Sequence, residues 1–167
     1  MINFNETRIT SYPKLEIKNN IDLRVKHDDE FPFAGGGNKA RKSLFVISEI
    51  IKEGYNCIIT NGSVYSNQIR TVSSICAYFG INCHVLIIKD DRLISKKSIN
   101  LELAEKYGAE ISFISYEDLQ KSLQDIILNS SKKGLKPYYF DNSGKSSLSL
   151  NAYINAGKNF INQLNDI

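Results

Sequence analysis

The chain has few of the residues that cross-link or stiffen a protein: its 167 residues include three cysteines, three prolines, one methionine and no tryptophan. An odd number of cysteines without a Cys-x-x-Cys spacing argues against a disulfide framework and against a cysteine zinc site. Cys57, Cys76 and Cys83 instead fall in apolar runs. We therefore expect buried free thiols and a reducing, cytoplasmic location.

The sequence also has no apolar run near the roughly 20 residues of a membrane span, and its start does not look like a secretory leader. A net charge of +3 with scattered lysines provides no basic stripe for nucleic acid. His27 and His84 share no metal-ligand spacing with cysteines or carboxylates. We therefore expect no membrane, nucleic acid or metal among its partners.

What the chain does have is a recurring glycine pattern. Gly54, Gly80, Gly108 and Gly134 each follow a helix-like stretch and precede a short apolar run. Glycine just past a helix end is the usual left-handed cap. The pattern predicts βαβ units and right-handed crossovers, and so an α/β fold with a parallel sheet between two helix layers. The expected strands are Cys57–Thr60, Cys83–Ile88, Ile111–Ile114 and Tyr138–Phe140, and the expected helices cover 69–79, 119–127 and 150–164.

The region before this block has a different pattern. Residues 1–20 are expected to be irregular, and Ile21–Lys26 to form a short strand because its apolar residues alternate. A helix is expected over 39–53. It should be buried on most sides, because the apolar residues between Leu44 and Ile51 cover a broad arc.

A glycine loop stands at the start of that helix, where Gly35–Gly37 precede Asn38 and Lys39. A helix start offers free backbone N–H groups and the positive end of the helix dipole, so it attracts anions. The loop is not a Walker A motif, because Arg41 stands where that motif requires glycine. It matches the dinucleotide-binding fingerprint only loosely. A surface turn with solvated lysines is the alternative.

A second polar segment, Asn61–Gln68, directly follows the first expected strand of the sheet. Ligands bind at this carboxyl edge in open α/β folds, although Ser66 or Asn67 would also serve simply as a helix cap. An amine at one helix start and a Ser-Asn-Gln group at another suit a site that holds an aldehyde cofactor by a Schiff base beside a carboxylate substrate. Asp141–Ser147 follows the last strand, and would line the same cleft or only cap the final helix.

Together these segments resemble the N-terminal half of the 1-aminocyclopropane-1-carboxylate deaminase and D-cysteine desulfhydrase family. These are pyridoxal-phosphate enzymes of fold type II, the tryptophan-synthase-β type. The family pattern is a basic-acidic strand end, a glycine loop close to GGNKxRK and, one helix and strand later, a segment ending SNQxRQ. The corresponding residues here are Val25–Asp29, Gly36–Lys42 and Ser66–Arg70, with Thr71 in place of the last glutamine.

The resemblance implies that Lys39 forms the Schiff base with pyridoxal 5'-phosphate and then moves protons on the substrate. It implies that Asn38, Lys39 and Asn67 contact the cofactor and that Ser66, Asn67 and Gln68 bind the substrate carboxylate. The implied activity is that of a deaminase- or desulfhydrase-like lyase acting on a small amino acid. D-cysteine, a cyclopropane amino acid and other small amino acids all present the same carboxylate and amine to these residues.

The resemblance also implies a domain plan. Residues 1–53 would belong to a larger cofactor domain, 54–147 would form a smaller α/β domain, and 148–167 would return to the larger domain. Family members are nearly twice this length, and their second half carries the phosphate cup and completes the larger domain. We therefore expect the strand Ile21–Lys26 to lack a sheet partner within this chain. We also expect a split enzyme, completed by a second polypeptide in a hetero-oligomer, or a homo-oligomer. A catalytically inactive subunit, a binding module or a truncated remnant is the alternative.

Overall fold

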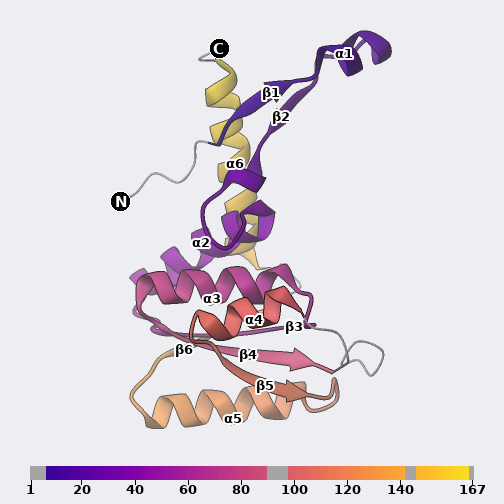
Figure 1. Ribbon diagram of the computed structural model, residues 1–167. Coiled ribbons are helices and arrows are strands. Elements are labelled where there is room, and N and C mark those ends of the chain that lie inside the picture. The colour runs from indigo at the N-terminus through magenta and orange to yellow at the C-terminus, as the bar shows by residue number, and fades with distance from the viewer. Residues whose placement is uncertain (1–6, 90–97, 142–145, 166–167) are drawn as a thin grey trace.

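A four-stranded parallel sheet forms the centre of the computed structural model, which describes residues 7–89, 98–141 and 146–165 (Figure 1). The strand order is β5-β4-β3-β6. All four expected strands are present, each within two residues of its predicted bounds. They are β3 (Cys57–Gly62), β4 (Asn82–Ile88), β5 (Glu110–Ile114) and β6 (Pro137–Phe140).

Helices cover both faces of this sheet, so the predicted three-layer α/β arrangement is confirmed (Figure 1). On one face, Ile59 and Leu86 pack in an apolar cluster with Leu123 of α5 (Leu119–Lys132). On the other face, Ile58 and Val85 belong to a larger cluster shared with α2 (Gly37–Lys52) and α3 (Asn67–Phe79). Neighbouring residues of β3 therefore serve opposite faces, as the pleat of a strand requires.

The glycine pattern also performs its predicted role. Gly54, Gly80, Gly108 and Gly134 all have φ between 66° and 84°. Each lies just past a helix end, including that of α4 (Ile99–Lys106). Only glycine adopts this left-handed conformation without a steric cost, which explains why one follows each helix.

The helix that carries Lys39 is buried on most sides, as expected. Val46, Ile47 and Ile50 of α2 are inaccessible to solvent. The helix packs against α3 and against α6 (Ser147–Asn165). Because α2 shares one apolar cluster with the sheet, the described part of the chain shows no separate core for residues before 53. The predicted domain boundaries stay a prediction.

The N-terminal region differs from the expectation. Residues 1–20 are not irregular where the structure describes them, since they contain β1 (Ile9–Ser11) and α1 (Pro13–Asn19). The expected strand over Ile21–Lys26 is shortened to β2 (Arg24–Lys26), and it pairs antiparallel with β1. The expectation that this strand lacks a partner in the chain is therefore wrong. Three-residue strands show too little alternation to be detected in a sequence.

The hairpin of β1 and β2 extends away from the sheet beside α6 (Figure 1). Lys26 Nζ donates a hydrogen bond to Gln163 of α6. Gln163 Nε2 in turn donates to the carbonyl of Thr7, over 3.2 Å. These bonds join the two ends of the described chain.

The three cysteines are free and buried, as predicted. Within the described ranges, none of the helices has the length and apolar character needed to cross a membrane.

Candidate active site

The two polar motifs of the sequence lie side by side at the carboxyl end of the sheet. A Cβ built on Gly35 would be 3.9 Å from the Arg70 guanidinium, and Lys42 Nζ donates to Gln68 Oε1 over 2.9 Å. The first contact joins the glycine loop to α3, and the second joins α2 to α3. The strand β3 that precedes α3 has β4 on one side and β6 on the other, so the strand order reverses there. A crevice at such a switch point is the usual ligand site of open α/β sheets.

The glycine loop has an unusual backbone. All five residues from Phe33 to Gly37 have positive φ, between 47° and 86°. A Cβ on Gly36 would lie 2.3 Å from the carbonyl oxygen of Asp29, so no other residue fits there. Phe33 and Ala34 hold a conformation that costs non-glycine residues about 1–2 kcal/mol each. Strain of this kind persists only where surrounding structure imposes it, and it is concentrated at functional sites.

An ion pair fixes the first turn of α2 below this loop. Arg41 Nε lies 3.0 and 2.9 Å from the two carboxylate oxygens of Asp28, and Arg41 Nη2 lies 2.6 Å from one of them. The Phe31 ring packs 4.5 Å from the same guanidinium. Arg41 is buried, so this two-point contact holds the turn that also carries Lys39.

Lys39 is half-buried in that turn, and Asn38 beside it is exposed. Among the described residues, the Lys39 amine has no hydrogen bond and no ion pair. It is therefore available to an incoming group, as a nucleophilic lysine must be.

Lys42, one helical turn further on, is almost inaccessible, with 1% of its surface exposed. Its ammonium lies 5.0 Å from the centre of the Phe140 ring and donates to Gln68. Burial and, to a smaller extent, the charge of Lys39 lower the pKa of Lys42 to about 8, while the charge of Asp141 acts in the opposite direction. The sequence analysis gave this residue no role. The signal available was its spacing of three from Lys39, which places both on one face of a buried helix.

Both the oxygen and the nitrogen of the Gln68 side-chain amide form hydrogen bonds within the protein. Its oxygen accepts from Lys42, and its Nε2 lies 3.1 Å from Thr60 Oγ1, 3.3 Å from the Phe140 carbonyl and 3.2 Å from the Asp141 carbonyl. These bonds join α2 and α3 to the ends of β3 and β6. The expected role of Gln68 in binding a carboxylate stays a prediction, and this geometry favours a positioning role.

Ser66 is half-buried and Asn67 is exposed at the start of α3. Ser66 Oγ accepts a hydrogen bond from the Gln68 backbone N–H over 3.2 Å, so the capping alternative is confirmed for this serine. Its hydroxyl hydrogen is still available to a ligand. Asn67, exposed at the first residue of α3, accepts through Oδ1 from Asn100 Nδ2 over 3.3 Å. Asn100 lies on α4, and no motif in the sequence pointed to it.

The segment after β6 is only partly described. The Asp141 carbonyl belongs to the Gln68 network, and Ser146 Oγ accepts from the Ser149 backbone N–H over 3.1 Å. The capping alternative therefore holds for Ser146, at the start of α6. Residues 142–145, which the sequence analysis also placed near the cleft, lie outside the described ranges.

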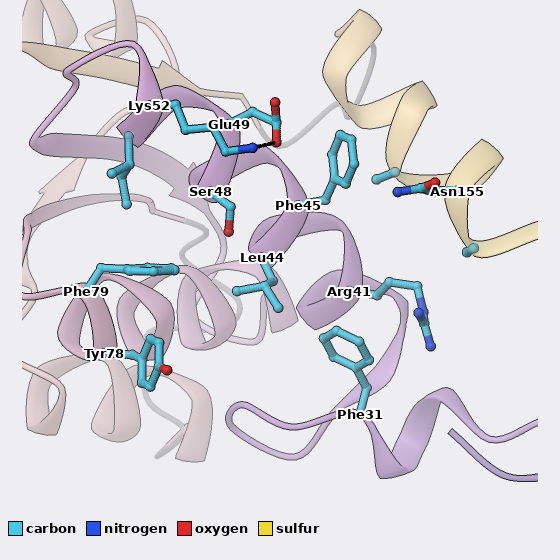
Figure 2. Close-up of a pocket in the computed structure, with 13 residues that line it drawn as sticks. Phe31, Arg41, Leu44, Phe45, Ser48, Glu49, Lys52, Tyr78, Phe79 and Asn155 are labelled. Atoms are coloured by element: carbon cyan, nitrogen blue, oxygen red, sulfur yellow. Dashed lines mark hydrogen bonds and ion pairs between the residues drawn. The ribbon is translucent and has the colours of Figure 1, made fainter. Parts of the chain in front are cut away.

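A cavity of about 520 Å³ lies between α2, α3 and α6, and Lys39 is not among the residues that line it (Figure 2). Phe45 and Ile51, from the apolar arc of α2, contribute to its wall with Phe79 and Asn155. The other side of that arc is covered by the sheet.

The donors carried by Lys39, Ser66 and Asn67 suit an aldehyde cofactor with an acceptor oxygen. Lys39 supplies an amine that makes no hydrogen bond or ion pair with another described residue, and Asn67 and Ser66 supply hydrogen-bond donors at a helix start. With the three-layer fold, this defines a candidate fold-type-II cofactor enzyme. Residues 3–167 match the family described as pyridoxal-phosphate dependent enzyme, and the chain belongs to that family.

The individual relatives agree with this assignment. The chain is 25% identical over 165 residues to D-cysteine desulfhydrase of Salmonella typhi, covering 96% of this chain and 50% of that protein. The crystal structure of an ACC deaminase homologue matches with a TM-score of 0.80 at 23% identity, covering 97% of this chain and 50% of the other. A hydrogen sulfide-producing enzyme of Fusobacterium nucleatum matches with a TM-score of 0.64 at 21% identity, covering 99% and 54%.

These comparisons confirm the resemblance inferred from the sequence and its limitation to half of a family member. The chain spans about half the length of the curated relatives it matches. Pyridoxal phosphate is thereby implied as the family cofactor. The roles of Asn38, Lys39, Ser66, Asn67 and Gln68 stay predictions.

Proposed function

We propose that this chain is half of a pyridoxal-phosphate enzyme that acts on a small amino acid by deaminase- or desulfhydrase-like lyase chemistry. The observation that supports this most is the placement of the Lys39 loop beside the Ser66–Asn67 helix start, at the switch point of the sheet. An amine and anion-binding donors are then carried on neighbouring helix starts at the same end of the sheet.

The residues of the chain divide the work by position. Lys39 binds the cofactor through Nζ and afterwards carries a proton to or from the substrate at that nitrogen. Asn38 contacts the cofactor from the same turn. Ser66 donates its hydroxyl hydrogen, and Asn67 its amide hydrogens, to acceptor oxygens of substrate and cofactor. When bound, pyridoxal phosphate supplies an electron sink for the carbanion next to the substrate nitrogen.

Gln68 and Lys42 stabilise the relative placement of Lys39, Ser66 and Asn67. Their hydrogen bond ties the turn after Lys39 to the helix that starts with Asn67. Because both side chains are buried, the two helix starts are held in a fixed relation, which is the pre-organisation that a binding site needs.

The other half of the enzyme is proposed to come from a second polypeptide; a homo-oligomer of this chain is the alternative assembly. The half-length match to the relatives supports this. A catalytically inactive subunit with the same fold is the second candidate. The half-length match also favours this candidate, because half of a family member is inactive if no second half joins it. A cytoplasmic location remains a prediction.

The test is covalent labelling of the protein, isolated gently with whatever it binds. We expect incubation with pyridoxal phosphate and borohydride reduction to leave one cofactor mass on Lys39, located by peptide mass spectrometry. Lys39→Ala should abolish the label and the amino-acid lyase activity. Lys52→Ala is the matched control, because Lys52 lies on the same helix but is exposed and paired with Glu49 over 2.6 Å.

Labelling spread over several exposed lysines, or labelling that survives Lys39→Ala, would overturn the assignment of Lys39. A specific label on Lys39 without turnover of any small amino acid would favour the inactive subunit instead.

A further inference from the structure

A chain of hydrogen bonds behind Asn67 begins at Arg70. Arg70 Nη1 lies 2.9 Å from one amide atom of Asn100. A guanidinium only donates, so that atom is the Asn100 oxygen. The other amide atom of Asn100 lies 2.7 Å from the carbonyl oxygen of Tyr65, which only accepts. Two independent partners therefore fix the same orientation of the Asn100 amide.

The fixed orientation of Asn100 passes to Asn67. Asn100 Nδ2 also lies 3.3 Å from Asn67, and as a donor it selects the Asn67 oxygen. The remaining group of Asn67 is its NH₂, which makes no hydrogen bond to any other described residue. Asn67 thus turns two donor hydrogens toward the open side of the α3 start.

The residues behind Asn67 are themselves held in place. The Arg70 guanidinium lies against the glycine loop, since a Cβ built on Gly35 would be in van der Waals contact with it at 3.9 Å. The start of α4 is fastened to the loop before α3, because Ser98 Oγ donates to the Val64 carbonyl over 2.5 Å. These contacts therefore fix the position of Asn100 relative to Asn67.

We propose that Arg70 and Asn100 are positioning residues that fix the Asn67 amide with its NH₂ group toward the ligand. The site then takes an oxygen with lone pairs and negative charge at this point, such as a phenolate or carboxylate oxygen. This inference rests on the proposed function of the same crevice, but it concerns residues outside the predicted site.

Asn100→Asp tests the orientation with almost no change in shape. The introduced carboxylate can still accept from Arg70, but it can no longer donate to Tyr65 or Asn67. We expect the Asn67 amide to turn over and donate to that carboxylate. Ile99→Asp is the matched control, since it adds the same charge one residue earlier at a side chain that is 72% exposed.

The first readout uses the ligand-free chain labelled with ¹⁵N. In the wild type and in Ile99→Asp, the Asn67 side-chain NH₂ protons should exchange rapidly with water. In Asn100→Asp their exchange should slow severalfold, because they become hydrogen-bonded. An unchanged exchange rate in Asn100→Asp would overturn the proposed orientation.

The second readout is the dissociation constant for pyridoxal phosphate, followed by absorbance. Asn100→Asp should weaken binding by roughly tenfold, as expected for one lost hydrogen bond to a charged acceptor. Ile99→Asp should stay within twofold of the wild type. An equal loss in both variants, or no loss in either, would overturn the positioning role. This measurement uses the protein isolated gently with whatever it binds, as in the labelling experiment. If that wild-type preparation binds no pyridoxal phosphate, the proposed function fails, and the exchange measurement still decides the orientation.

Discussion

Lys42 is the titratable residue whose burial has the clearest consequence for stability. Its pKa lies near 8 in the folded chain, against an ordinary value of 10.5. Between these values the unfolded chain binds more protons at this lysine than the folded chain does. The contribution of Lys42 to the free energy of unfolding should therefore rise as the pH increases from about 8 to 10.

We expect Lys42→Met to remove this rise. The substitution leaves the Gln68 oxygen without its donor, at a cost of about 1–3 kcal/mol that does not depend on pH. Urea unfolding of wild type and variant at several pH values from 7.5 to 10 measures the difference in slope. Lys52→Met is the control, because that lysine is exposed and should keep the wild-type slope. Equal slopes in wild type and Lys42→Met would contradict the burial of a charge-bearing group.

For individual residues of the candidate site, the sequence was informative where a motif is contiguous. Lys39 and Ser66–Gln68 could be proposed as site residues because each stands at a loop that runs into a helix. Lys42 and Asn100 were missed because their importance depends on contacts between separate helices, Lys42 with Gln68 and Asn100 with Arg70. No local pattern encodes such contacts.

Among the elements, the glycine loop before α2 makes the most specific demand on the sequence. Gly36→Ala should destabilise the fold by about 2–4 kcal/mol, because its Cβ would lie 2.3 Å from a backbone oxygen. Gly37→Ala is the matched control. It has a φ of +86° but nothing within 4 Å of a Cβ, so only the conformational cost of about 1 kcal/mol applies. Denaturant unfolding compares the two, and equal losses would show that packing against Asp29 contributes nothing.

The elements of the sheet could be predicted because glycine caps and apolar runs alternate along the chain. The hairpin of β1 and β2 could not, since its strands have three residues each. Their pairing depends on tertiary contacts such as the bond from Lys26 to Gln163 of α6, 137 residues away. Local propensity carries little information about an element of that kind.

For the whole molecule, the outer face of α6 has the exposure expected of an interface. Leu150, Ile154 and Ile161 are 61%, 47% and 59% exposed on this one helix. Apolar surface gathered in this way marks a contact site. It lies on the side of the molecule away from α5 (Figure 1).

We therefore expect the chain to associate through α6, with a partner or with itself. The double substitution Ile154→Glu and Ile161→Glu should raise the monomer fraction in sedimentation velocity severalfold. Leu128→Glu on α5, at a side chain that is 58% exposed, should leave it unchanged. A wild-type chain that is fully folded, monomeric and monodisperse would contradict the need for another half.

The three buried thiols make the rate of thiol modification a measure of how fast the core opens. Cys57, Cys76 and Cys83 lie in or beside the central sheet and are 0%, 1% and 6% exposed. Burial raises the pKa of Cys57, and a hydrogen bond with Cys83 together with burial raises that of Cys76, so the reactive thiolate is disfavoured in the closed state. A thiol reagent can therefore react only as fast as the layers separate. Two of the thiols flank β4 from α3 and β3, so the chain reports the opening of its own core without any added label.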